Sequence, residues 1–352
     1  MLTVINLGMT NEGRDRLSDI LKEQLRGLEH DEAAGVAGFE EKLKGESLDR
    51  IVLAVRIPAN GVCLECHQMR GFLIDHPGCL KGCIGGIIID GMGELFTKSV
   101  ARQLAFAMDL AGCTLPGRAL VEATGTLYNF NTISKVNGVD NMTAYGKSVG
   151  VLIHKVNDFK MPKVEHPNIL VVHASSRSTS NSILLWDMIK KDLGDRADIT
   201  EISLRNGAVI DCRGCSYETC LHYGEHGDCL YGGVMVEQVY PAILKCDTLV
   251  MVCPNYNDAV SANITAFINR LTALFRSNDF SRKRVFALVV SGYSGSDIVS
   301  GQVIGAMSFN KNFILQGGGI MTETANDPRS ILECEGIEGR AEEFAGRLLG
   351  QL

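Results

Sequence analysis

Four cysteines stand close together in the second half of the sequence: Cys212, Cys215, Cys220 and Cys229. Thiolates at C-x2-C-x4-C-x8-C spacing can surround one metal centre, either a [4Fe–4S] cluster or a structural zinc ion. A cluster is favoured because zinc sites usually join two pairs that are separated by a dozen or more residues. His222 and His226 keep zinc open as an alternative. A reduced, cysteine-rich loop without metal is the simplest competing interpretation.

A serine-rich stretch after the apolar run at 169–174 is a second candidate site. It offers the polar side chains Ser175, Arg177, Ser180, Asn181 and Ser182, and an apolar helical pattern begins at residue 183. A buried strand that enters a helix through a polar turn presents free backbone N–H groups and the positive end of the helix dipole, which suit a phosphate. Hydroxyls and a guanidinium add charge-assisted hydrogen bonds. A turn with an ordinary helix cap is the alternative.

The first half has its own cysteines, Cys63, Cys66, Cys79 and Cys83, and their spacing matches a pair of zinc knuckles. The expected fold opposes a shared site. The first two cysteines begin a helix and the last two follow it, so the helix would hold the pairs roughly 20 Å apart at opposite ends of the sheet. We therefore expect no four-cysteine metal site there.

Composition limits the classes of partner. The chain has 352 residues, 45% of them hydrophobic, and a net charge of −7 without a basic run, which disfavours nucleic acid and anionic membrane surfaces. No apolar run approaches the ~20 residues of a membrane span, and residues 1–8 resemble a strand and not a signal peptide. We expect a soluble, cytoplasmic protein, in which the twelve cysteines are metal ligands, redox groups or core residues instead of disulfides.

Strand and helix patterns alternate along the chain. Strand-like runs occur at 2–7, 51–55, 84–90 and 118–123, with helical patterns between them and a last helix within 140–155. The stretch 29–48 is polar and only weakly helical. This alternation predicts parallel βα units with helices on both faces of a sheet.

The second half repeats this scheme. Val4 aligns with Val171, a shift of 167 residues, and Val52 aligns with Val250, a shift of 198 residues. The difference of 31 residues predicts an insertion in the second copy at 206–233, which contains the four clustered cysteines. We predict two domains, residues 1–157 and 168–352, joined by a polar linker at 158–167.

Two further motifs connect these features to a known family. The stretch Pro254-Asn-Tyr-Asn-Asp-Ala-Val-Ser continues into a helix that ends Phe-Ile-Asn-Arg270, and Ser291-Gly-Tyr-Ser-Gly295 follows a later strand. With the loop at 174–182, these motifs resemble the flavodoxin-like NAD(P)H-dependent FMN reductase superfamily, and within it the iron–sulfur flavoproteins. The resemblance covers about 167–352 well and the first half only in outline.

The resemblance implies two tandem flavodoxin-like, doubly wound parallel sheets of strand order 2-1-3-4-5. It implies FMN as cofactor, with the phosphate on 175–182 and the ring against the second and third loops. The residues implied beside the ring are Pro254, Asn255, Tyr256, Asn257, Ser291, Gly292 and Gly295. NAD(P)H would be the electron donor and a [4Fe–4S] cluster would lie near the flavin. This chemistry requires no protein acid or base, so no catalytic residue is assigned.

Two alternatives stay open at this point. The family's cysteine spacing is usually C-x2-C-x2-C-x5–7-C, tighter than the one found here, so a flavoprotein with a structural zinc is the first. A flavodoxin-like electron carrier without reductase activity is the second. In each case the expected partners are small-molecule or protein electron donors and acceptors.

The first half lacks the residues of the phosphate loop. Glu12 stands where the second half has its serine-rich turn, and a carboxylate at that place repels phosphate. We predict that this degenerate copy binds no FMN. It would supply the wall that a neighbouring subunit gives to the flavin site in the family, so the protein is either a homodimer or a monomer with a pseudo-partner domain.

Overall fold

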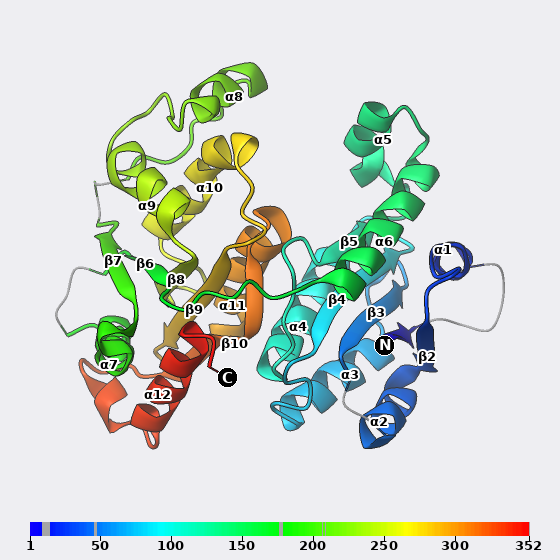
Figure 1. Ribbon diagram of the computed structural model, residues 1–352, viewed down its shortest axis with the longest axis horizontal. Coiled ribbons are helices and arrows are strands. Elements are labelled where there is room, and N and C mark those ends of the chain that lie inside the picture. Colours follow the sequence, from blue (N-terminus) through cyan, green and yellow to red (C-terminus); the bar gives the residue numbers. More distant parts are fainter. Residues whose placement is uncertain (9–14, 46–47, 176–178, 206, 208, 352) are drawn as a thin grey trace. The chain divides into compact units, whose positions relative to one another are not determined.

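The computed structural model describes residues 1–8, 15–45, 48–175, 179–205, 207 and 209–351. They form two compact units, Met1–Lys160 and Met161–Leu352. Each unit is built on a five-stranded parallel sheet flanked by helices (Figure 1). Across the described part of the chain, no helix has both the length and the apolar character needed to cross a membrane.

The first unit has the strand order β2-β1-β3-β4-β5, which is the predicted order 2-1-3-4-5. Its strands are β1 (Leu2–Leu7), β2 (His30–Ala34), β3 (Arg50–Ile57), β4 (Ile84–Gly91) and β5 (Leu120–Ala123). Its helices are α1 (Arg16–Gln24), α2 (Gly35–Gly45), α3 (Leu64–Asp75), α4 (Thr97–Leu110), α5 (Asn131–Asn137) and α6 (Asn141–Asp158). The central strand β4 is buried along its whole length, as its isoleucine-rich sequence requires of a parallel strand covered on both faces.

The stretch 29–48 differs from the expectation of a weak helix alone. It contains the edge strand β2, which pairs in parallel with β1 from Leu2↔His30 to Asn6↔Ala34, and then α2. The residues of β2 are polar and lie half-buried or exposed. An edge strand needs little apolar sequence because it pairs on one side only, so hydrophobic periodicity does not reveal it.

The second unit has the order β7-β6-β8-β9-β10, again the order 2-1-3-4-5 counted within the unit. Its strands are β6 (Asn168–His173), β7 (Asp198–Ser203), β8 (Thr248–Pro254), β9 (Arg284–Ser291) and β10 (Ile314–Thr324). Its helices are α7 (Asn181–Leu193), α8 (Tyr217–Glu225), α9 (Tyr240–Lys245), α10 (Ala262–Ser277), α11 (Ser296–Val303) and α12 (Ile337–Leu348). The predicted fold class, a tandem pair of flavodoxin-like sheets, is confirmed.

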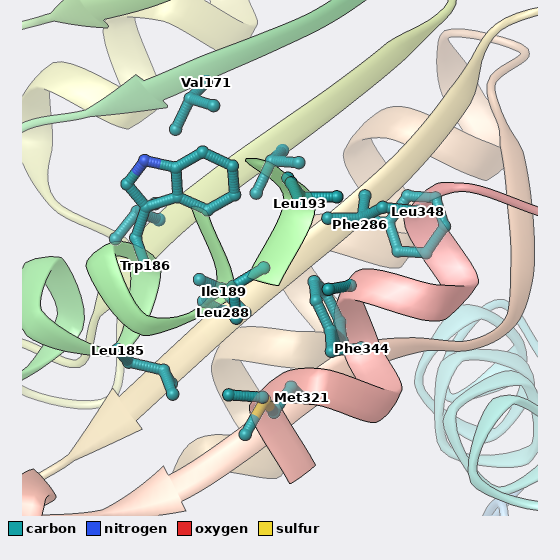
Figure 2. Close-up of a cluster of buried hydrophobic side chains, with 14 of the residues drawn as sticks. Val171, Leu185, Trp186, Ile189, Leu193, Phe286, Leu288, Met321, Phe344 and Leu348 are labelled. Carbon is teal, nitrogen blue, oxygen red and sulfur yellow. The ribbon is translucent and has the colours of Figure 1, made fainter. Parts of the chain in front are cut away.

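The core on one face of the second sheet fixes α7. Trp186 and its neighbours on α7 pack against the sheet beside Phe286 and against Phe344 of α12 (Figure 2). The rings of Phe286 and Phe344 meet edge to face at 5.5 Å between centroids, a favoured aromatic geometry. This packing holds the first turn of α7, and with it the serine-rich stretch, at the end of β6.

Candidate functional site

Three loops leave the carboxyl edge of the second sheet. They follow β6, β8 and β9, which end at His173, Pro254 and Ser291. The strand order reverses between β6 and β8, and doubly wound sheets bind ligands at such a switch point. The topology therefore brings the ends of the three sequence motifs to one edge, as the strand alternation predicts.

Asn255 joins the second and third loops. Its amide Nδ2 donates to the carbonyl oxygen of Ser294 at 2.8 Å and to Ser291 Oγ at 3.1 Å. Gln302 of α11 adds a second link, because its Oε1 accepts from the backbone N–H of Val260 at 3.0 Å. Asn255 is thus a positioning residue for both loops, in addition to the role beside the flavin that the family resemblance implies.

A tight reversal shapes the second loop. Asn257 and Asp258 have φ of 53° and 58°, in the left-handed region, and Tyr256 and Ala259 exchange backbone hydrogen bonds of 3.1 and 3.2 Å across them. Two consecutive left-handed residues of this type form a hairpin turn in which Asn and Asp are preferred. The turn leaves the Tyr256 side chain 57% exposed, so its ring is available to a ligand.

The third loop needs glycine for reasons of space. Gly295 has φ of 84°, and a Cβ on it would fall within the contact distance of the Asp258 carboxylate and 2.8 Å from Asn255 Nδ2. A Cβ on Gly292 would lie 2.8 Å from Asn326 Oδ1. Asn326 also donates to the Tyr293 hydroxyl at 3.0 Å. Its position after β10, a strand that carries no family motif, explains why the sequence did not point to it.

The first loop is described only in part. Arg177 lies outside the described residues, Ser175 and Ser182 are buried, and Ser180 is the N-cap of α7 without a side-chain cap hydrogen bond. Asn181 is engaged within the protein. Its Nδ2 donates to the carbonyl oxygens of Ala325 and Asp327, both at 2.9 Å, while its Oδ1 accepts from the N–H of Ile331 at 3.3 Å. This amide anchors the loop after β10 to the start of α7.

Buried polar atoms at this edge lack partners among the described residues. They are His173 Nδ1 at the end of β6, Ser203 Oγ at the end of β7 and Asn255 Oδ1 just after β8. Burial lowers the pKa of His173, which favours the neutral ring. Buried polar atoms are normally hydrogen-bonded, so the set suits a polar ligand and fits FMN at this edge. A histidine that closes an apolar strand was the available sequence signal for His173, and the motif analysis passed over it.

The four clustered cysteines line a single cavity in the second unit. Cys212, Cys215, Cys220 and Cys229 surround a space of about 340 Å³ between the insertion and α10. Cys215 lies 3.4 Å from the Tyr231 hydroxyl. Among the residues that the structure describes, no three potential ligands are close enough together to hold a metal ion. The thiols therefore share a cavity without converging on one point.

Two adjacent residues of α10 anchor the insertion on both sides of the cysteines. Arg270 is buried, and its guanidinium donates to the carbonyl oxygens of Ile210 at 3.5 Å and Gly232 at 2.8 Å. Asn269 donates to Asp211 Oδ1 at 3.0 Å. The arginine that closes the family-like helix motif thus holds the loop in which the thiols lie.

The carboxyl edge of the first sheet is closed by an ion pair. Arg16 donates through Nε and Nη2 to both oxygens of buried Asp90, each at 2.7 Å, and through Nη2 to the carbonyl oxygen of Thr124 at 2.9 Å. Tyr145 donates to Asp90 Oδ2 at 3.2 Å. The guanidinium occupies the ends of β4 and β5 on the edge where a ligand would sit. Glu12 lies outside the described residues, so its effect on phosphate stays a prediction.

The cysteine pairs of the first unit lie at the two ends of α3. Cys63 and Cys66 are at its start, and Cys79 and Cys83 follow its end and precede β4. A twelve-residue helix is about 18 Å long. This is the separation that the sequence predicts, and it argues against one shared metal site.

Comparison with known proteins places the second half in a family. Residues 167–327 match the family model of the NADPH-dependent FMN reductases. An iron–sulfur flavoprotein of Archaeoglobus fulgidus is 30% identical over 152 residues, which are 42% of this chain and 72% of that protein.

Solved structures give weaker likenesses. An NAD(P)H:quinone oxidoreductase from Methanothermobacter marburgensis is 13% identical with a TM-score of 0.40, over 52% of this chain and 97% of that one. An FMN-dependent NADH-azoreductase from Bacillus anthracis is 15% identical with a TM-score of 0.35, over 52% and 99%. The assignment rests on the sequence matches: the chain belongs, through its second half, to the NADPH-dependent FMN reductase family and is a flavin oxidoreductase that uses NAD(P)H.

Proposed function

We propose that each chain binds one FMN, on the second unit, and passes electrons from NAD(P)H through it to a small-molecule or protein acceptor by way of an iron–sulfur cluster in the cysteine cavity. The family assignment supports the flavin chemistry and favours a reductase over an electron carrier. The orphaned polar atoms of His173, Ser203 and Asn255 support the location. The Arg16–Asp90 pair at the first sheet's edge supports a single flavin per chain.

The three loops divide the work of holding FMN. Ser175, Arg177, Ser180 and the first turn of α7 would bind the phosphate through hydroxyls, a guanidinium and backbone N–H groups. Tyr256 and the backbone of 291–295 would flank the ring system, and Asn255 keeps those two loops in register. When bound, FMN supplies the exchange between two-electron and one-electron steps. The protein groups orient it and set the polarity around it.

One observation carries the cluster proposal: all four thiols and a buried arginine line the same cavity. Arg270 Nε has no hydrogen-bond partner among the described residues, and a fixed cation beside four thiolates offsets their mutual repulsion. A cavity of about 340 Å³ is large for one ion, because zinc binds sulfur at ~2.3 Å and would draw the thiols together. His222 and His226 contact each other and are not among the residues that line the cavity.

The decisive experiment is an anaerobic purification of the full chain. Assays of iron, acid-labile sulfide, zinc and FMN, with a visible spectrum, should give iron and sulfide in equal amounts and one FMN per chain. Zinc without sulfide would replace the cluster with a structural ion. Two FMN per chain would contradict a silent first unit. The Cys215→Ser variant is the control, because it should lose iron and sulfide and keep FMN.

Arg270 gives a second, independent test of the cavity. The Arg270→Gln variant should retain less than about a tenth of the wild-type iron, because the carbonyls of Ile210 and Gly232 lose their shared donor and the insertion is released. Arg276→Gln is the matched control. Arg276 lies on the same helix and lines the same cavity, but its guanidinium stacks on the Tyr217 ring at 4.4 Å. Equal iron in the two variants would remove Arg270 from the role proposed.

A further inference from the structure

A second pair of thiols, outside the flavin unit, occupies the start of α3. Cys63 is the N-cap residue of that helix, with extended backbone angles of φ −124° and ψ 107°, and Cys66 is its third residue. Both side chains are buried, with 6% and 5% of their surface exposed. Both are free thiols in the structure.

The second unit shows what this position holds in an ordinary helix start. Cys63 aligns with Ser261 at the repeat shift of 198 residues. Ser261 is the N-cap of α10, and its hydroxyl accepts from the N–H of Ile264 at 3.4 Å. Serine is a preferred N-cap and cysteine is not. Helix capping therefore does not explain Cys63, and still less a second cysteine at the position of Ile264.

The surroundings favour a reactive thiolate at Cys63. The Cys66 thiol donates to the Cys63 sulfur and lowers the pKa of Cys63 to about 7, against the opposing effect of burial. The N–H groups of Glu65 and Cys66 act in the same direction, without forming a cap bond of ordinary geometry. The same hydrogen bond and burial raise the pKa of Cys66. A thiolate paired with a protonated thiol at a helix start is the arrangement of redox-active C-x-x-C motifs.

The charged groups near Cys63 come from α3 itself. The Glu65 carboxylate opposes the thiolate and accepts from the Gly8 N–H at the end of β1. His67 and Arg70 line a small cavity together with the two thiols, whereas α4 contributes only uncharged residues to its wall. That cavity measures about 10 Å³, which is the space of one water molecule. A reagent that reaches the sulfur must therefore be small.

We propose that Cys63 and Cys66 form a reversible redox pair that small hydroperoxides oxidise to a disulfide. The Cys63 thiolate attacks the peroxide, so that an S–O bond forms, the O–O bond breaks and the alcohol or water leaves with a proton. The Cys66 sulfur then attacks the Cys63 sulfenic acid, an S–S bond forms and water leaves with the Cys66 proton. In total, two thiols and one hydroperoxide give one disulfide, one alcohol or water from the peroxide, and one further water. The dithiol loses two electrons and the peroxide gains them.

The same unit contains a matched pair that should not react. Cys83 and Cys113 are fully buried and contact each other, and burial raises the pKa of Cys113. Thiols of raised pKa without access to solvent are inert. The Cys83→Ser variant should therefore leave the behaviour of Cys63 and Cys66 unchanged.

The test uses the full-length protein, reduced with a phosphine and then treated with one equivalent of hydrogen peroxide. Alkylation with iodoacetamide, digestion and mass spectrometry should find Cys63 and Cys66 joined, and renewed reduction should restore both labels. The rate should rise about tenfold from pH 6 to pH 8 and then level off, because thiolate forms across a pKa near 7. An ordinary thiol of pKa ~8.5 would gain on the order of a hundredfold over the same range.

Variants separate the two sulfurs. In Cys66→Ser, oxidation should stop at a sulfenic acid on Cys63 that dimedone traps. Cys63→Ser, which copies the cap of the second unit, should fold normally and leave Cys66 reduced. The proposal is overturned if both wild-type cysteines keep their alkyl labels after peroxide treatment, or if Cys83 and Cys113 join at the same rate. None of these measurements depends on flavin or iron, so the outcome is independent of the function proposed above.

Discussion

Replacing Gly295 with alanine is expected to weaken FMN binding by at least about tenfold. The residue has φ of 84°, where a side chain costs roughly 1–2 kcal/mol. The added Cβ would also displace the Asp258 carboxylate and the Asn255 amide, and the amide is the link between the second and third loops. A loss of 1.4 kcal/mol in binding is a factor of ten in affinity. Fluorescence titration of the flavin-free protein with FMN measures the effect.

Gly138→Ala is the control for the backbone cost alone. Gly138 ends α5 with φ of 63°, and a Cβ there would meet nothing within 4 Å. This variant should lose a similar amount of local stability and bind FMN as the wild type does. If Gly295→Ala binds FMN normally, the loop after β9 does not take part in the site. A thermal melt of both variants distinguishes loss of binding from loss of the fold.

The Asp90→Asn variant should destabilise the first unit by about 2–4 kcal/mol. Removing one partner of a buried ion pair costs about 3–5 kcal/mol; the expected value is lower because a quarter of the Arg16 side chain is exposed. The amide keeps the size of the carboxylate but withdraws the charge from Arg16 and one acceptor from the network that includes Tyr145.

Urea unfolding followed by two probes locates the effect. The only tryptophan of the chain, Trp186, lies in the core of the second unit, so its fluorescence reports that unit, whereas far-ultraviolet circular dichroism reports both. The dichroism transition should move to lower urea and the fluorescence transition should stay. Asp140→Asn is the control, because it replaces one good N-cap of α6 with another. Equal stability of Asp90→Asn and wild type would show that the pair contributes nothing to the fold.

The architecture of the protein was predictable because its signals are local. Buried parallel strands need runs of β-branched residues, and the runs at β1, β4, β6 and β9 are visible without any structure. Their alternation with helices fixes the fold class, and the topology then places the motif-bearing loops at one edge. The edge strand β2 escaped because a strand paired on one side carries polar residues.

Roles that depend on distant partners were not predictable. Asn181 belongs to the phosphate motif by sequence, yet its amide is engaged with residues 144 to 150 positions away. Arg270 ends a family-like motif, and only its contacts with Ile210 and Gly232 show that it supports the cysteine insertion. Such contacts depend on which segments the topology brings together, and local spacing carries no record of them.

The sequence by itself determined the tandem flavodoxin-like fold, the family of the second half and the cysteine residues available for redox chemistry. The tertiary structure decided how those cysteines are grouped. Four line one cavity beside Arg270, two form a close pair at the start of α3, and Cys83 meets Cys113 in the core. The physical reason is that a thiol's chemistry depends on its burial, its neighbours and the helix end it occupies, and these are properties of the folded chain.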